Sequence, residues 1–578
     1  MPLALPRLAE EDGWAEPYFG ELSARLLLQF FKSKGLAALK QEDRAEQWYD
    51  DWIAFQREHR IYARLLCPAR LSSIGGELNF LRLARFLELF AYLSPSHGYS
   101  LQVTFLGFFS ILMGDNEALK QEAVEILEAG GLLAFGVSER AHGSDLLANE
   151  FIVAELATGG FRGGGGKYYI GNSNLAELIT VLARKQAYSD RGRARRASPA
   201  LLAIRPNQSP GFRQVGKIRT VGIRSAHVGE FSVQGHEFAP SDVIAQDRAA
   251  WEAVLGTVTL GKFLLGFGAI GICEHAMEEA VGHLKRRILY GKPASDMPHI
   301  RSKMAHGYAR LAAMKLYAYR ALDYVLAASP QDGRYLLFNA VQKAKVSTEG
   351  VRVVALLAEC MGAKAFESDT YFEMALRDVQ LIPALEGSAH INLSLAAQFG
   401  GRYFEGRAAT LPDVPSAVLG EVSSYENAYL QQAGSERPDQ SAFGPHATAF
   451  APLLRVRNVR LVANQAAALA QVLRDSPSAD LSARDTEVGL AVGRCVATVA
   501  YAQLVAENAV RLGVGRKLIA AMFHEIATDL SAAAGDLLAA GPQFPKGSRD
   551  SLRRMVRVPR TSASVWAWVA DQVRKFGT

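Results

Sequence analysis

Apolar residues recur at helical spacing in the first quarter of the chain. Residues 83–90 (LARFLELF) and 117–128 place apolar side chains three and four positions apart, which predicts amphipathic helices. Residues 101–114 are largely apolar but too few to cross a membrane, so they predict a buried core helix. Pro95 and Gly98 predict a loop after the first helix. We expect a helical domain over residues 1–130.

The pattern changes between residues 131 and 245. Short runs rich in branched and aromatic residues alternate with glycines, and the clearest are 151–153, 178–182, 201–204 and 231–233. Strands of this length and spacing predict a small antiparallel sheet. The run Gly163–Gly166 lies between two predicted strands, with no Lys-Ser/Thr pair or helix start after it. It therefore predicts a hairpin turn rather than a phosphate loop.

Long helical patterns return after residue 245 and predict a helical bundle over 246–405. A polar stretch rich in Pro, Gly and Ser at about 406–445 predicts a linker, and runs such as 459–473 and 488–512 predict further helices. Residues 406–578 are thus expected to form a linker and a helical extension. The predicted fold class is mostly α with a central β-domain, because helices and strands fall in separate blocks.

The composition of the chain limits the classes of function that it can have. The chain has 578 residues, 49% hydrophobic and 21% charged, with a net charge of +6. This mild basicity comes with no nucleic-acid-binding signature, and it suits an acidic ligand such as a nucleotide, a CoA thioester or an acidic carrier protein. Four scattered cysteines show no metal spacing and predict a reduced, cytoplasmic location. The first residues (MPLALPRLAEEDGW) do not predict a signal peptide, and we expect no transmembrane segment.

Four segments carry candidate chemistry, in the order 135–145 (FGVSERAHGSD), 167–172 (KYYIGN), 222–240 (with GIRS and EFAP) and 287–388 (with RILYGK and ALEGS). Taken singly, each is also explained by an ordinary turn or core strand. In this order they resemble the acyl-CoA dehydrogenase family, over roughly residues 80–400. Residues after about 406 resemble, loosely, the extra helical region of larger members.

The resemblance implies a flavin dinucleotide, FAD, and assigns it residues in the first two segments. In the family the first segment contacts the flavin ring and pyrophosphate, which implies such roles for Phe135, Val137, Ser138, Gly143 and Ser144. Glycines let backbone N–H groups approach an anion, and small hydroxyls can donate to it. Arg140 and Ala141 replace the usual Pro-Gly.

In the second segment, Tyr169 stands where an aromatic ring flanks the flavin. Gly171 replaces a Thr whose hydroxyl approaches the reactive flavin nitrogen. This departure from the family pattern affects how the protein adjusts the reactivity of the flavin more than it affects how the flavin is bound.

The later segments imply a phosphate contact and a catalytic base. Arg287 matches an Arg that reaches the dinucleotide phosphates across a dimer interface, a task that suits its planar fork. Gly362 and Ser388 match further dinucleotide contacts. Glu359 replaces a Gln there, so a cation such as Lys364 is needed to compensate its charge.

Glu386 falls on the family's base, beside Leu385, which replaces an aromatic residue. Burial among residues 382–385 would raise the pKa of its carboxyl and make it a stronger base. The alternative is a surface Glu at a helix start. Some members place the base at the position of Gly261, which cannot serve.

The predicted function is FAD-dependent α,β-dehydrogenation of an acyl thioester, borne by CoA or an acyl carrier protein, to the trans-2-enoyl thioester. The resemblance implies an electron-transfer flavoprotein as acceptor and a homodimer or a dimer of dimers. Two alternatives stay open: a flavin oxidase or monooxygenase on the same fold, and a non-catalytic relative that binds a thioester or a partner.

A basic segment at residues 184–196 is a further candidate. It holds six Lys or Arg residues and one Asp between two predicted strands. It is either a solvated loop or a docking patch for an acidic partner, which would act by long-range steering that salt screens.

Overall fold

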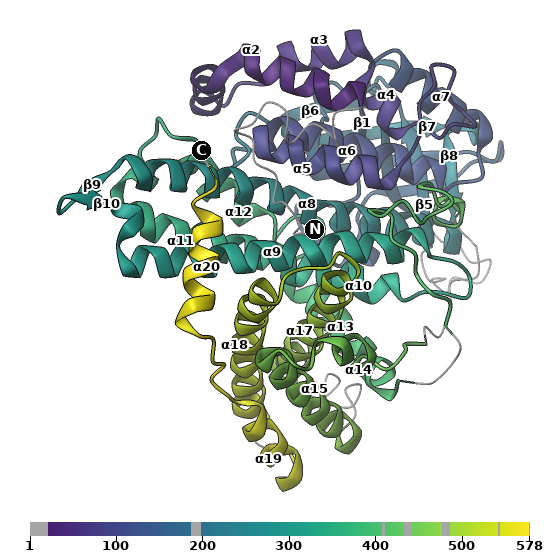
Figure 1. Cartoon of the computed structure of the whole chain (residues 1–578). Helices are drawn as coiled ribbons and strands as arrows, with labels where there is room; N and C mark the ends of the chain where they lie inside the picture. Colours follow the sequence, from purple (N-terminus) through teal and green to yellow (C-terminus); the bar gives the residue numbers. More distant parts are fainter. Residues whose placement is uncertain are drawn as a thin grey trace. The chain divides into compact units, whose positions relative to one another are not determined.

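The computed structural model describes residues 21–186, 198–406, 411–432, 442–476, 486–541 and 544–576. The chain divides into two compact units. The first comprises Glu21–Leu264 with Ser424–Arg437, and the second comprises Leu265–Ser423 with Pro438–Thr578. Figure 1 labels helices and strands of both units.

The first unit begins with helices: α2 Leu22–Ala45, α3 Asp50–His59, α4 Ile61–Leu66, α5 Phe80–Leu93, α6 Pro95–Leu112 and α7 Glu117–Glu128. The predicted helices at 83–90, 101–114 and 117–128 are confirmed as parts of α5, α6 and α7. The side chains of Asn79 and Asn116 accept the N–H groups of Arg82 and Leu119, which fixes where α5 and α7 begin.

The loop predicted at Pro95 is wrong. Ser94 alone separates α5 from α6, and Pro95 is the first residue of α6. Proline suits a first helical turn because its φ is already near the helical value and its missing N–H has no intrahelical partner there. Nearly every residue of α6 is buried, as expected for a core helix.

The sheet follows, with strands β1 Leu133–Gly136, β2 Ile152–Glu155, β3 Phe161–Gly171, β4 Leu178–Lys185, β5 Pro199–Ile204, β6 Phe212–Lys217, β7 Val228–Phe238 and β8 Val243–Gln246. Their order is β6-β7-β3-β2-β4-β5-β8, with β1 beside β4. All four predicted strands are confirmed. The sheet is mixed rather than antiparallel, since β4 runs parallel to both β1 and β2. Strand periodicity is the same in both directions, so it does not reveal orientation.

Gly163–Gly166 do not form the predicted hairpin turn, since they lie inside β3. The register of β3 against β7 shifts between Gly163 and Gly165, and neighbouring backbone comes very close. A Cβ atom at Gly163 would lie 2.1 Å from the carbonyl oxygen of Ile152. Glycine in this strand therefore permits close approach of the neighbouring backbone. The local sequence is equally compatible with a turn, so it did not reveal which of the two forms.

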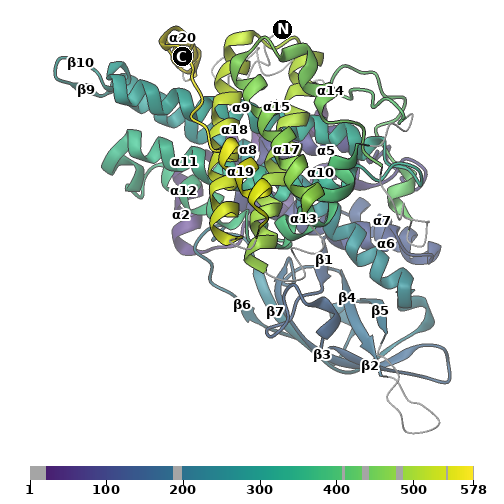
Figure 2. The same ribbon diagram turned by 90° about the horizontal axis from the view of Figure 1, so that it is seen from below.

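The second unit contains the bundle, whose helices are the later part of α8 Asp247–Arg286, α9 Pro298–Leu326, α10 Tyr335–Val341, α11 Ser347–Met361, α12 Tyr371–Leu381 and α13 Ala389–Glu405. Gln342–Val346 form a π-helical turn between α10 and α11. A short hairpin, β9 Ile288–Leu289 and β10 Lys292–Pro293, follows α8. Figure 2 shows α9, α10 and α13 of this bundle side by side with helices of the extension.

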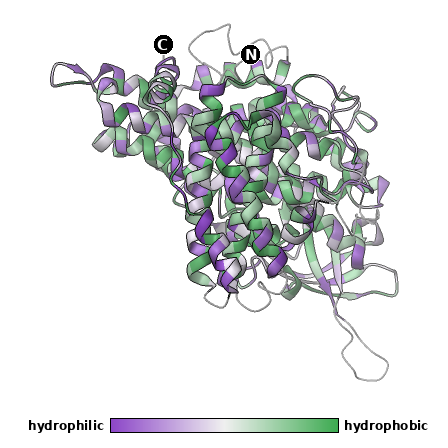
Figure 3. Ribbon diagram, turned by 60° about the horizontal axis from the view of Figure 1, so that its bottom comes forward, coloured by the Kyte–Doolittle hydropathy of each residue, from purple (hydrophilic) through white to green (hydrophobic). Residues whose placement is uncertain are grey.

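The extension adds α14 Ala447–Phe450, α15 Arg457–Asp475, α17 Thr486–Arg511, α18 Arg516–Ala540, α19 Lys546–Met555 and α20 Ala563–Val573. The helices predicted at 459–473 and 488–512 are confirmed as α15 and α17. Helix α17 packs against α9 and α13, and α18 packs against α9. Figure 3 shows hydrophobic and hydrophilic residues mixed along the helices of the protein.

Two helices, α8 and α17, are long and apolar enough to span a membrane by length and composition. Within their most apolar windows, 72% and 83% of the residues are buried inside the protein. Burial of this extent is typical of core helices.

The basic segment falls largely outside the described residues. Arg184 and Lys185 end β4, whereas residues 187–197 are not described. Its role as a docking patch stays a prediction.

Candidate functional site

The first unit brings the first two motifs together. The N–H of Tyr168 donates to the carbonyl oxygen of Ser138 at 3.0 Å, and the Ser138 hydroxyl donates to the carbonyl oxygen of Tyr168 at 2.6 Å. Phe135 is buried in β1, and Val137 and Ser138 are half-buried after it. The segment 135–138 thus runs beside β3, and Ser138 lies next to the residue that precedes Tyr169.

A buried ion pair joins the same two motifs. The Lys167 ammonium lies 2.8 Å from the Glu139 carboxylate, and both side chains are almost fully buried. Glu139 also accepts the N–H groups of Glu150 and Phe151, at 2.6 and 3.0 Å. Burial lowers the pKa of Lys167 to about 8, while Glu139 opposes the shift. Glu139 and Lys167 stand in the segments 135–145 and 167–172, and only the fold brings them together.

Tyr169 projects from an irregular point in β3. Its φ is +64°, the register against β7 shifts around it, and 59% of its side chain is exposed. A left-handed backbone at a bulge redirects a side chain out of the strand's alternation. The adjacent Tyr168 ring lies under the Arg140 guanidinium at 4.4 Å. Tyr169 therefore offers an accessible aromatic ring.

Gly143 and Ser144 lie on an exposed turn after Ser138. Among the described residues, nothing lies within 4 Å of the point where a Cβ of Gly143 would stand. The neighbouring His142 and Asp145 side chains lie 2.7 Å apart, and that contact raises the pKa of His142. This turn therefore leaves room for a ligand close to the backbone.

Gly171 is packed against Tyr99 and Val103 of α6. A Cβ at Gly171 would lie 2.6 Å from Cγ2 of Val103 and 2.7 Å from Cε1 of Tyr99. The family's Thr therefore does not fit in this structure, because the Tyr99 ring fills its space. The sequence offered no signal for this pairing, since the two residues are far apart in the chain.

The second unit holds Glu386 on a turn between α12 and α13. Glu386 and Gly387 both have left-handed backbones, with φ of +53° and +89°. The N–H of Ala389 donates to the carbonyl oxygen of Pro383 at 2.9 Å. The Asn392 amide donates to the carbonyl oxygens of Gly387 and Ser388 at 3.2 and 3.0 Å. Glu386 is half-buried and therefore is not a freely exposed surface residue.

Ser388 begins α13 as its N-cap residue, and its hydroxyl lies 3.0 Å from Nε2 of His390. Its proximity to Glu386 follows directly from the sequence, and its contact with a dinucleotide stays a prediction.

Arg287 and Gly362 lie together in the same unit. The exposed Arg287 donates from Nη1 to the carbonyl oxygen of Met361 at 3.5 Å, next to Gly362, which caps α11 with φ of +64°. The nearby Glu359 is paired with Lys303, so its charge is compensated by a cation that sequence reasoning did not name. Lys364 instead contacts Glu367.

These groups fit parts of FAD within each unit. Tyr169 presents a flat aromatic face, and the Gly143–Ser144 turn is open. The exposed Arg287 guanidinium suits a phosphate, and the space around Gly362 is open among the described residues. The roles of the individual residues toward FAD stay predictions.

Comparison with known proteins identifies one family. The family models described as "Acyl-CoA dehydrogenase, middle domain" and "Acyl-CoA dehydrogenase, C-terminal domain" match residues 134–235 and 250–400. A short-chain-specific acyl-CoA dehydrogenase from Megasphaera elsdenii is 24% identical over 279 residues, which cover 48% of this chain and 70% of that protein.

Solved structures share the fold. An acyl-CoA dehydrogenase complexed with FAD from Bacillus anthracis aligns with a TM-score of 0.72 and 18% identity, covering 96% of this chain and 93% of that one. Nitroalkane oxidase aligns with a TM-score of 0.57 and 17% identity, covering 64% of this chain and 91% of the other. The predicted fold, a β-domain between helical regions with a helical extension, is confirmed.

Proposed function

Because the chain belongs to the acyl-CoA dehydrogenase family of FAD-dependent oxidoreductases, we propose that it oxidises an acyl thioester to the trans-2-enoyl thioester, with Glu386 as the base. One observation carries the assignment of the base. Glu386 has a left-handed backbone on a turn held by hydrogen bonds at Pro383, Gly387 and Ser388. Non-glycine residues keep such backbones where surrounding contacts impose them, and these positions cluster at active sites.

The proposed reaction removes two hydrogens from adjacent carbons. The Glu386 carboxylate takes the proton from Cα, and the electron pair of that C–H bond forms the new double bond as the β-hydrogen departs. FAD, when bound, accepts that hydrogen as hydride. The chain's residues hold the base in place, and Tyr169 and Arg287 are proposed to hold the ring and a phosphate of the cofactor.

We also propose the partners of this reaction. The acyl group is carried by CoA or by an acyl carrier protein, and an electron-transfer flavoprotein is the acceptor that the family resemblance implies. We also propose a homodimer or dimer of dimers and a cytoplasmic location.

The experiment is an absorbance spectrum of the purified protein, followed by anaerobic titration with acyl-CoA and acyl-carrier substrates of increasing chain length. We expect an FAD spectrum that bleaches with at least one thioester class. A protein that holds FAD but is not bleached by any thioester in the panel would contradict the proposed substrate class.

The second candidate is a flavin oxidase. The likeness to nitroalkane oxidase favours it, and so does the replacement of a Thr by Gly171, which is packed against Tyr99. Stopped-flow mixing of reduced protein with oxygen separates the two: fast reoxidation indicates an oxidase, and slow reoxidation with fast transfer to an electron-transfer flavoprotein indicates a dehydrogenase.

A further inference from the structure

The π-helical turn Gln342–Val346 presents two buried lysines in different directions. Lys343 is 0% exposed and Lys345 is 8% exposed. The hydroxyls of Ser347 and Thr348 donate to the carbonyl oxygens of Lys343 and Ala344, which supports the widened turn. Single π-helical turns are uncommon and are found disproportionately at functional sites.

Lys343 reaches the turn that carries Glu386. Its ammonium donates to the carbonyl oxygen of Ile382, the residue that follows α12. If α12 continued, that carbonyl would accept the N–H of residue 386. The chain instead turns left-handed at Glu386, and Lys343 supplies the donor. A cation at a helix C-terminus is also favourable for the helix dipole.

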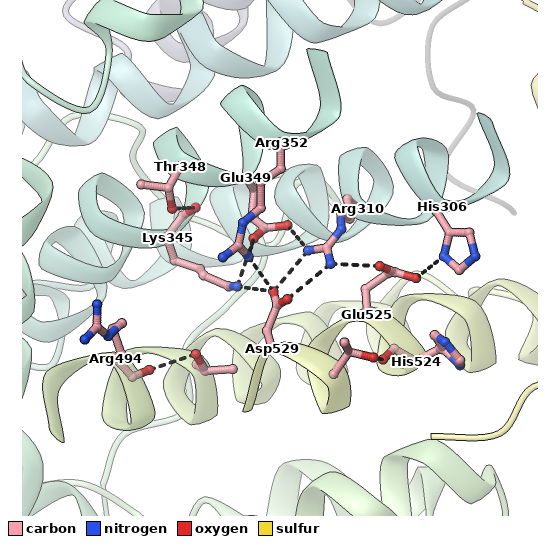
Figure 4. A network of polar contacts seen from close by, with 12 residues as sticks. His306, Arg310, Lys345, Thr348, Glu349, Arg352, Arg494, His524, Glu525 and Asp529 are labelled. Atoms are coloured by element: carbon pink, nitrogen blue, oxygen red, sulfur yellow. Dashed lines mark hydrogen bonds and ion pairs between the residues drawn. The ribbon is translucent and has the colours of Figure 1, made fainter. Parts of the chain in front are cut away.

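Lys345 faces the extension. Its ammonium contacts Glu349 at 2.9 Å and also contacts Asp529 of α18. Arg310 of α9 joins the same two carboxylates at 2.6 and 3.0 Å (Figure 4). Arg352 contacts both as well, at 2.8 and 3.0 Å.

The charges in this cluster balance. Arg310, Lys345 and Arg352 face Glu349, Glu525 and Asp529, and Glu525 also meets His306. Burial acts to raise the pKa of Asp529, but Lys345 and Arg310 outweigh it and hold that pKa far below its ordinary range. Removing one member would leave a buried charge uncompensated, which is strongly unfavourable. The cluster therefore ties the π turn to α18.

We propose that Lys343 is a positioning residue for Glu386, and that the C-terminal extension takes part by holding, through Asp529, the π turn from which Lys343 reaches. This proposal rests on the proposed role of Glu386 as the base. In this proposal, Lys343 does not contact the substrate. It ends α12 at the residue where the base must leave the helix, and Asp529 keeps Lys343 at the distance that this requires.

The first test compares Lys343→Met and Lys343→Arg in FAD-loaded protein. We expect Lys343→Met to slow anaerobic flavin reduction by about 10- to 100-fold, because small misplacements of a reacting group are costly. The dissociation constant for the thioester and the FAD content should stay near the wild-type values, and the pH profile of reduction should shift. Lys343→Arg, which restores a donor, should recover most of the rate. Wild-type rates in a folded Lys343→Met protein would overturn the proposal.

Glu386→Gln distinguishes a wrong assignment of the base from a wrong role for Lys343. If this variant reduces its flavin at the wild-type rate, the proposed base is wrong. If Glu386→Gln is slow, the Lys343→Met change should add little to it, since a group that cannot accept the proton gains nothing from its position. Additive losses in the double variant would show that Lys343 acts elsewhere.

A second test reaches the same turn from the extension and also serves if Lys343→Met fails to fold. Asp529→Asn keeps the side-chain shape but removes the charge, and we expect reduction to slow by about 3- to 10-fold through the turn that it holds. The control is Asp536→Asn on the same helix, whose carboxylate meets Arg494 at 3.8 Å on the exposed side. Equal reduction rates in the two variants, with only thermal stability lowered in Asp529→Asn, would overturn the role of the extension.

Discussion

Tyr169 and Glu386 share a backbone conformation that few residues of their kind adopt, with φ of +64° and +53°. Tyr169 lies within a strand that pairs with β7 on both sides of the irregularity, so backbone hydrogen bonds hold it. Glu386 lies between two helices, and its turn depends on one backbone hydrogen bond, from Ala389 to Pro383, together with the side chains of Lys343 and Asn392.

The difference indicates how each site responds to change. A conformation imposed by backbone pairing survives most side-chain substitutions nearby. A conformation imposed by a few side chains depends on each of them, and each hydrogen bond contributes about 1 kcal/mol. The Glu386 turn should therefore be the more fragile of the two.

The largest effect should come from Glu386 itself. Glu386→Gln keeps the shape of the side chain but cannot accept a proton, and we expect flavin reduction to slow by about 10²- to 10⁴-fold. FAD content and thioester affinity should be retained. The measurement is single-turnover anaerobic reduction, and an undiminished rate would show that the base lies elsewhere.

Acid should lower the free energy of unfolding in both regions, because each contains a partly buried, neutral histidine. Burial lowers the pKa of His446, packed near Tyr403 of α13, to about 4, and burial with Lys217 lowers that of His227, beside Asn172, to about 4. Both rings are neutral in the folded protein and would charge in the unfolded chain below about pH 6.5. The stability that these two neutral rings contribute is thus present above about pH 6.5 and is lost as the pH falls toward 4, by about 1–3 kcal/mol per histidine, because both side chains are only partly buried and water screens part of the effect.

Denaturant unfolding between pH 7 and 4 measures this loss. His446→Phe should flatten the dependence relative to wild type. An unchanged slope in a folded His446→Phe protein would remove His446 as a source of acid sensitivity.

Packing should make one position near Tyr169 sensitive. Gly171→Ala forces a Cβ into contact with Val103 and Tyr99, and overpacking of this kind costs about 1–3 kcal/mol. Gly143→Ala is the matched control, because its Cβ meets nothing within 4 Å among the described residues. Thermal unfolding should distinguish the two, and equal melting temperatures would contradict the packing described at Gly171.

The smallest effect should come from Asn392, which supports the Glu386 turn. Asn392→Ala removes the donors to Gly387 and Ser388, and we expect flavin reduction to slow by about ten-fold, which corresponds to about 1.4 kcal/mol. Asn392→Gln tests whether an amide at a longer reach restores the turn. A wild-type rate in Asn392→Ala would mean that Lys343 and the backbone suffice to hold Glu386.

The order of elements was predictable from local patterns. Helix α7 spans the predicted residues 117–128, and the strands at 151–153 and 201–204 were found from branched residues. Pro95 and Gly163–Gly166 were misread because proline and glycine permit several local structures, and tertiary packing decides among them. Strand direction in the mixed sheet was likewise beyond any local signal.

The residues of the candidate site also fall into two groups, those that local sequence could locate and those that it could not. Ser138, Tyr169 and Glu386 stand in short contiguous motifs, so a family resemblance locates them. Lys343, Lys303 and Tyr99 act on residues far along the chain, at Ile382, Glu359 and Gly171. Only the fold brings these pairs together, which is why sequence reasoning missed them.

Parts of the second unit should open at different temperatures, because only some of them are held by the charge cluster around Arg310 and Asp529. The hydration free energy of charged groups becomes less favourable on warming, so buried ion pairs become less costly to keep. Apolar contacts gain no comparable advantage. On heating, we expect the join between α18 and the π turn to stay closed while helices without such a cluster, such as α19, begin to exchange their amide hydrogens. In a heated sample, the π turn from which Lys343 reaches Ile382 would therefore be among the last parts of this unit to open.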